Sequence, residues 1–77
     1  MMHMSKELKF GITGMTCAHC VQSVTEEVSA LAGVSEVKID LVNGGQSVMT
    51  LTTENGIDPS EVKAAVAEAG NYVAAAL

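Results

Sequence analysis

Two cysteines three positions apart are the most reactive side chains in this sequence. Cys17 and Cys20 are the only cysteines, and His19 lies between them. At the start of a helix, two thiolates at this spacing can reach one soft metal ion, and the positive end of the helix dipole favours their deprotonated form. The chain has no second cluster of His and Cys to complete a four-ligand cage. We therefore expect an ion bound here to be under-coordinated and exchangeable.

Three kinds of chemistry are compatible with the cysteine pair. Two thiolates without a third ligand suit Cu(I), whereas zinc normally takes at least three protein ligands, and the loop holds no Asp or Glu. Thiol–disulfide exchange also uses this spacing, but the chain is short for a thioredoxin-like domain. A structural disulfide would close a very short loop and constrain the unfolded chain little. The spacing favours metal transfer and leaves redox chemistry open.

Composition excludes some classes of function. Nine acidic residues against four lysines and no arginine give a net charge of -5, so there is no basic stripe to neutralise nucleic-acid phosphates. A basic protein partner would be favoured. No apolar run approaches the roughly 20 residues of a membrane span, and residues 1–10 lack the features of a signal peptide. We expect a cytoplasmic protein without membrane insertion, with a disordered tail at 1–5 and one domain at 6–77.

Hydrophobic periodicity predicts six elements. Alternation predicts strands, and apolar residues three and four apart predict helices. Asn43-Gly44 predicts a hairpin turn, and Asp58-Pro59 predicts a capped helix start. In order, the elements are a strand at 6–12, a helix at 17–31, strands at 34–41 and 46–52, a helix at 59–69 and a strand at 72–77.

This βαββαβ order predicts an α+β fold of the ferredoxin-like kind. Right-handed crossovers place both helices on one face of a four-stranded antiparallel sheet. The core must be mainly aliphatic, because Phe10 and Tyr72 are the only aromatic residues. The cysteine pair then lies where the first strand gives way to the first helix.

Residues 14–20, which read GMTCAHC, resemble the G-M-T/S-C-x-x-C signature of heavy-metal-associated domains. These domains are small copper chaperones and the N-terminal metal-binding modules of copper-transporting P-type ATPases. The resemblance continues at 31–34, 37–41 and 66–70, and it covers most of residues 6 to 73. The spacing C-x-x-C alone is not specific, but the seven-residue loop joined to a βαββαβ order is.

The resemblance implies a role for each residue of the loop. Cys17 and Cys20 match the two thiolate ligands of Cu(I). Met15 matches a methionine that packs under the loop without binding metal. Thr16 stands where zinc-exporting relatives have Asp, which favours Cu(I). His19 resembles a histidine that, in some bacterial chaperones, is credited with tuning the acidity of the cysteine pair; the alternative is a solvated histidine with no role.

Tyr72 departs from the family pattern. Related bacterial domains run Gly-Tyr directly after the second helix, with the tyrosine near the metal loop, whereas here Asn71 intervenes. A one-residue shift in a strand reverses side-chain direction. Tyr72 therefore reaches the loop only if Asn71 is absorbed as a left-handed cap or bulge, and otherwise packs at the sheet edge.

The function implied by the resemblance is that of a cytosolic copper(I) chaperone rather than an enzyme. It would pass Cu(I) by ligand exchange to the metal-binding domain of a copper-transporting P-type ATPase or to a copper-responsive regulator. A Cu(I)-bridged homodimer is also compatible with exposed paired thiolates. A thiol–disulfide redox protein and a zinc or mercury domain of the same fold remain alternatives, as does a module of a larger transporter.

Overall fold

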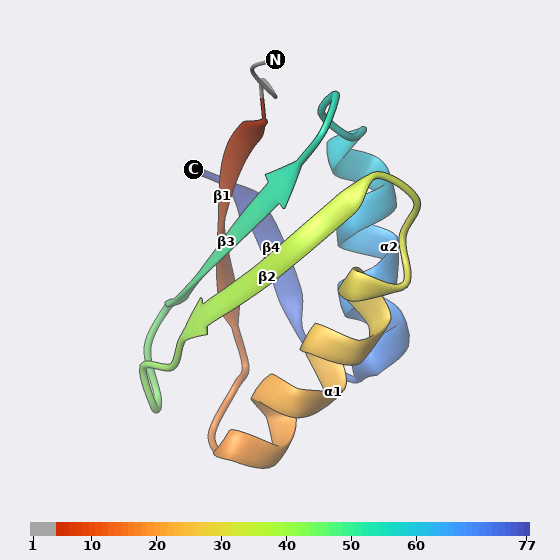
Figure 1. Ribbon diagram of the computed structural model, residues 1–77. Coiled ribbons are helices and arrows are strands. Elements are labelled where there is room, and N and C mark those ends of the chain that lie inside the picture. The colour runs from red at the N-terminus through yellow and green to blue at the C-terminus, as the bar shows by residue number, and fades with distance from the viewer. Residues whose placement is uncertain (1–4) are drawn as a thin grey trace.

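The computed structural model describes residues 5–77, so the predicted tail lies outside the described residues except for Ser5. The elements are β1 (Lys6–Thr13), α1 (Ala18–Ser29), β2 (Val34–Asp40), β3 (Ser47–Thr53), α2 (Pro59–Ala69) and β4 (Val73–Ala76). The sheet order is β2-β3-β1-β4, with all neighbours antiparallel. Both helices cover one face of this sheet (Figure 1). The predicted ferredoxin-like sandwich is confirmed.

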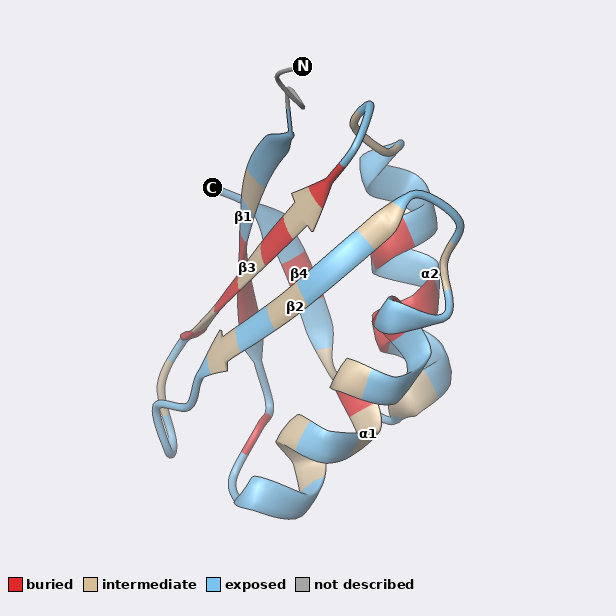
Figure 2. Cartoon of the chain, viewed as in Figure 1, coloured by how far each residue is buried: buried red, intermediate tan, exposed pale blue. Residues whose placement is uncertain are grey.

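The core lies between the sheet and the helices (Figure 2). In β3 every second residue is buried, so one face of this strand points into the core. Phe10 of β1 lies opposite Met49 of β3, and both are almost completely buried. The helices contribute the buried valines Val24, Val28, Val62 and Val66. The core is therefore mainly aliphatic, as the composition predicted.

The turn between β2 and β3 differs from a tight two-residue hairpin. The loop spans 41–46, and within it the Gly45 N–H donates to the Val42 carbonyl at 3.1 Å. Gly44 has a φ of +78°, whereas Asn43 keeps a negative φ. This combination is typical of a type II turn, in which only the second central residue needs a positive φ. Asn43-Gly44 thus marks the turn correctly, but inside a longer loop.

The helix α1 ends at Ser29, earlier than the predicted Leu31. The Leu31 N–H donates to the Val28 carbonyl at 3.1 Å, which tightens the last turn beyond α-helical geometry. The helix α2 begins as predicted. The Asp58 carboxylate accepts from the Ser60 N–H at 3.0 Å and from the Ser60 hydroxyl at 2.9 Å. These bonds lower the pKa of Asp58.

One end of the sandwich gathers the segments that carry the candidate site. The loop between β1 and α1 and the turn between α2 and β4 both lie at this end, where α1 begins and α2 ends (Figure 1). Residues 14–20 and 70–72 are far apart in the sequence, and the fold brings them together.

Candidate metal centre

The two cysteines occupy the start of α1. Cys17 is the N-cap residue, with extended backbone angles and no capping hydrogen bond from its side chain, and Cys20 lies in the first turn. The Cys17 carbonyl accepts from the N–H groups of Cys20 at 3.1 Å and Val21 at 3.4 Å. This first turn brings the two Sγ atoms to 3.6 Å from each other, and both thiols are free. Cys17 is exposed and Cys20 is half-buried, so the pair opens to solvent at Cys17.

The environment of Cys20 favours its thiolate. The backbone N–H of Thr16, the Tyr72 hydroxyl and the Cys17 side chain, in decreasing order, lower the pKa of Cys20 to about 6, against a smaller opposing effect of burial. Hydrogen bonds to the charged form stabilise that form. Cys20 is therefore mainly a thiolate at neutral pH, ready to bind a soft cation without first losing a proton.

Tyr72 lies at the site despite the insertion of Asn71. Its hydroxyl donates a hydrogen bond to Cys20, and this bond, with burial and the neighbouring cysteine charges, raises the pKa of Tyr72. The Tyr72 N–H donates to the Gly70 carbonyl at 2.9 Å, so a three-residue turn takes up Asn71 before β4 begins. Asn71 keeps a negative φ, so this turn replaces the left-handed cap or bulge that the sequence interpretation required.

Two glycines make room for this arrangement. Gly14 has a φ of +99°, and a Cβ there would lie 2.9 Å from the Asn71 carbonyl oxygen. A Cβ at Gly70 would lie 2.8 Å from the Tyr72 ring. Both distances are shorter than ordinary contacts, so a side chain at either position would push the tyrosine segment away from the loop. From the sequence, Gly14 was assigned only to the motif and Gly70 only to the end of α2.

The remaining candidate residues are distributed around the pair. Met15 is fully buried in the core beneath the loop, while Thr16 and His19 are exposed. The contribution of Thr16 comes from its backbone N–H, which the sequence interpretation, based on its side chain, did not anticipate. Any effect of His19 on the cysteines stays a prediction.

Within residues 5–77, no group of three or more His, Cys, Asp or Glu side chains is placed to hold a metal ion together. The site of the described chain is thus a thiol pair with a tyrosine hydroxyl beside Cys20. Within residues 5–77, neither helix is long and apolar enough to cross a membrane.

A ferredoxin-like sandwich with a paired-thiol loop at the start of α1 defines a class of small metal-binding domains. The chain belongs to the heavy-metal-associated domain family, whose model matches residues 9–71. It is 31% identical over 62 residues to the copper chaperone CopZ of Enterococcus hirae, covering 80% of this chain and 87% of that protein. It is 39% identical over 59 residues to human copper-transporting ATPase 2, covering 77% of this chain but 4% of the ATPase. The chain thus spans a small part of its ATPase relative.

Solved structures agree with this assignment. A copper binding domain from HMA7, a P-type ATPase, has a TM-score of 0.78 at 27% identity, covering 96% of this chain and 95% of that one. The N-terminal domain of ZntA in its Zn(II) form has a TM-score of 0.75 at 27% identity, covering 91% and 89%. The fold is thus shared by relatives described with copper and with zinc, and the choice of metal must be argued from this chain's own residues.

Proposed function

We propose that this protein is a cytoplasmic carrier of Cu(I) that holds the ion between Cys17 and Cys20 and releases it by ligand exchange. The observation that carries the proposal is the approach of the two sulfurs to 3.6 Å, with the pKa of Cys20 lowered to about 6. The loop thus offers a preformed and partly deprotonated pair of soft ligands.

The dimensions of the pair suit one ion held by both sulfurs. With metal–sulfur bonds of about 2.3 Å, two sulfurs on one ion are at most about 4.6 Å apart, in a linear arrangement. The present separation of 3.6 Å lies below that limit, so small rotations of the exposed Cys17 side chain open the pair to linear coordination. Zinc would require further ligands, and Thr16 offers no carboxylate. The donor set therefore favours Cu(I), a soft ion that accepts low coordination.

The unequal environments of the cysteines support an order of exchange. A partner's thiolate approaches the ion from the solvent side and forms a three-coordinate bridge. Cys20 then dissociates first, because hydrogen bonds from the Thr16 amide and the Tyr72 hydroxyl stabilise its free thiolate and make it the better leaving group. No electron is transferred, and the ion stays thiolate-bound throughout.

The partners of this exchange are proteins with similar thiol pairs. We assign this role to the metal-binding domain of a copper-transporting P-type ATPase or to a copper-responsive regulator, supported by the chaperone and ATPase relatives. A Cu(I)-bridged homodimer would use the same exposed face, with two copies supplying four sulfurs.

Competition titration tests the proposal. The protein should take up one Cu(I) from a chelator of known affinity and should compete far less well for Zn(II). The variant Cys17→Ser/Cys20→Ser should lose stoichiometric uptake, whereas the control Ala18→Ser, which adds a hydroxyl but keeps both thiols, should retain it. Native mass spectrometry along the titration reports stoichiometry and dimer formation. Uptake that survives the double substitution would refute the proposal.

A redox protein is the second candidate, because a lowered thiol pKa also activates C-x-x-C pairs in disulfide exchange. Turnover in an insulin-reduction assay separates the two functions. A carrier should show no turnover above that of the double serine variant, whereas sustained turnover would favour the redox function.

A further inference from the structure

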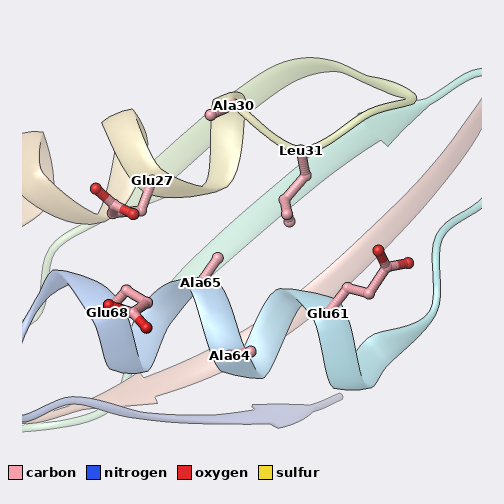
Figure 3. A pocket seen from close by; sticks show the side chains of 7 residues that line it. All are labelled: Glu27, Ala30, Leu31, Glu61, Ala64, Ala65 and Glu68. Atoms are coloured by element: carbon pink, nitrogen blue, oxygen red, sulfur yellow. The ribbon is translucent and has the colours of Figure 1, made fainter.

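A second surface feature lies between the two helices, on the side turned away from the sheet. It is an open hollow of about 400 Å³ between α1 and α2 (Figure 3). We call it the helix groove and define it by its lining residues, Glu27, Ala30, Leu31, Glu61, Ala64, Ala65 and Glu68.

The groove exists because the residues between the two helices are small. Large side chains usually fill the space between packed helices, but here alanines line it. Ala64 and Ala65 face this space from α2, and Ala30 lies across from them at the end of α1 (Figure 3). Leu31 is only half-buried, and its side chain points toward Ala65. The groove thus presents an apolar floor that can receive one large side chain.

Glutamates surround this floor. Glu27 comes from α1, and Glu61 and Glu68 come from α2; all three are exposed. None of the lining residues is basic, and Lys63, the only lysine of either helix, lies about 200° around α2 from Glu61. An apolar floor with an acidic rim complements a basic segment that carries one large apolar side chain.

We propose that the helix groove binds a lysine- or arginine-bearing segment of a partner protein, which inserts one large apolar side chain between Leu31 and Ala65. A second copy of this chain is a poor occupant, because two molecules of net charge -5 repel each other. Glu27 lies roughly 10 Å farther along α1 than Cys20, at 1.5 Å of rise per residue. A partner in the groove therefore holds the protein while the thiol pair stays accessible. This proposal goes beyond metal carriage and does not require it.

A designed peptide tests the charge and the anchor. The probe is a synthetic peptide with lysines on both sides of a single phenylalanine, titrated into the isotope-labelled, reduced and metal-free protein. The amide chemical shifts of residues 27–31 and 61–68 should move, and the shifts should weaken with added salt. A peptide with glutamates in place of the lysines should leave them unchanged. Repeating the titration with Cys17→Ser/Cys20→Ser should give the same result, which separates this proposal from the metal function.

Matched variants distinguish the groove from the general acidity of the surface. Replacing Glu27, Glu61 and Glu68 together by Gln should weaken peptide binding about tenfold, since each exposed charge pair contributes modestly. The control Glu26→Gln removes an exposed charge that does not line the groove and should change binding little.

Filling the groove tests the anchor in the same way. Ala64→Leu should abolish the localised shifts, whereas Ala67→Leu, at another exposed alanine that does not line the groove, should preserve them. Shifts centred on the thiol loop or the sheet, or equal binding of the acidic peptide, would overturn the proposal. Concentration-dependent shifts of the groove amides without peptide would overturn it too, because they would identify a second copy as the occupant.

Discussion

The two helices begin in opposite ways. At α2, Asp58 caps the helix, Pro59 takes the first helical position and Glu61 lies in the first turn, so local sequence stabilises this start. At α1, the cap position is held by Cys17, whose side chain makes no capping bond, and the first turn has no acidic residue. Residues far away in the sequence lie against the start of α1 instead: the Tyr72 hydroxyl donates to Cys20, and the Asn71 carbonyl lies close to Gly14.

This difference shows how the fold accommodates a reactive pair. A capping side chain at position 17 would occupy the free amides of α1 and remove one thiol. Leaving them uncapped keeps the positive end of the helix dipole available to the cysteines, at a cost in local stability. The Tyr72 hydroxyl also reaches this helix start, through its hydrogen bond to Cys20.

The largest expected effect comes from the close approach of Asn71 to the loop before α1. Gly14→Ala should lower the free energy of unfolding by about 2 kcal/mol, because a φ of +99° is strained for alanine and its Cβ would meet the Asn71 carbonyl. Gly44→Ala is the control, since Gly44 also has a positive φ but nothing lies within 4 Å of the added Cβ. Chemical denaturation measures both, and a loss no larger at Gly14 than at Gly44 would show that the contact contributes nothing.

Removing the local cap of α2 should have a smaller effect. Asp58→Ala should destabilise the protein by about 1 kcal/mol, because the Ser60 N–H loses its acceptor. The spacing of the thiols and the acidity of Cys20 should not change, since α2 begins at the other end of the sandwich (Figure 1). Denaturation and a thiol titration of the same variant check both parts, and a change in thiol acidity would contradict the separation of the two helix starts.

Supplying a cap to α1 should raise the free energy of unfolding, whereas removing the cap of α2 lowers it. Cys17→Ser should stabilise the metal-free protein by roughly 0.5 kcal/mol, because serine is a favoured N-cap and position 17 already has extended backbone angles. The same variant should bind Cu(I) much more weakly than the unaltered protein. A metal-free variant that is less stable than the parent would mean that the cysteine already supports the helix start.

The smallest expected effect is on the acidity of Cys20. Tyr72→Phe should raise the pKa of Cys20 above its present value of about 6, but not fully to that of a free thiol, because the larger contribution of the Thr16 amide remains. In the unaltered protein the lowered pKa contributes stability that is fully present above about pH 8.5, the ordinary thiol value, and is lost as the pH falls through 6. The variant should lose this contribution at a higher pH. Thiolate absorbance against pH measures the shift, and an unchanged midpoint would show that the hydroxyl does not donate to Cys20.

The element order was predictable because it depends on side-chain patterns. Periodicity located all six elements, while Asn43-Gly44 marked the turn between β2 and β3 and Asp58 marked the start of α2. The errors lie where backbone hydrogen bonds decide, as at the tightened end of α1 and in the loop at 41–46. Backbone hydrogen bonds are hard to predict from residue types, because every residue except proline carries the same donor and acceptor.

In the candidate site too, the side-chain features were predictable and the backbone features were not. The motif predicted that Cys17 and Cys20 lie side by side, and their Sγ atoms are 3.6 Å apart. It did not predict the Thr16 amide as the main cause of Cys20 acidity, since every residue except proline carries such an amide. The orientation of Tyr72 stayed open for a related reason: the three-residue turn at Asn71 depends on a backbone bond to Gly70.

The attachment of Tyr72 to a short edge strand has one more consequence. The strand β4 pairs with β1 through Phe10–Ala76, Gly11–Ala75, Ile12–Ala74 and Thr13–Val73. Among residues 5–77, no strand pairs with its other side. Because Tyr72 stabilises the Cys20 thiolate, detachment of β4 must weaken that thiolate, and by linkage the charged thiolate must hold β4 in place. The protection of β4 amides against hydrogen exchange, relative to their intrinsic exchange rate at each pH, should therefore increase as the thiol ionises. The stability of the last strand would then depend on the ionisation of a cysteine in α1.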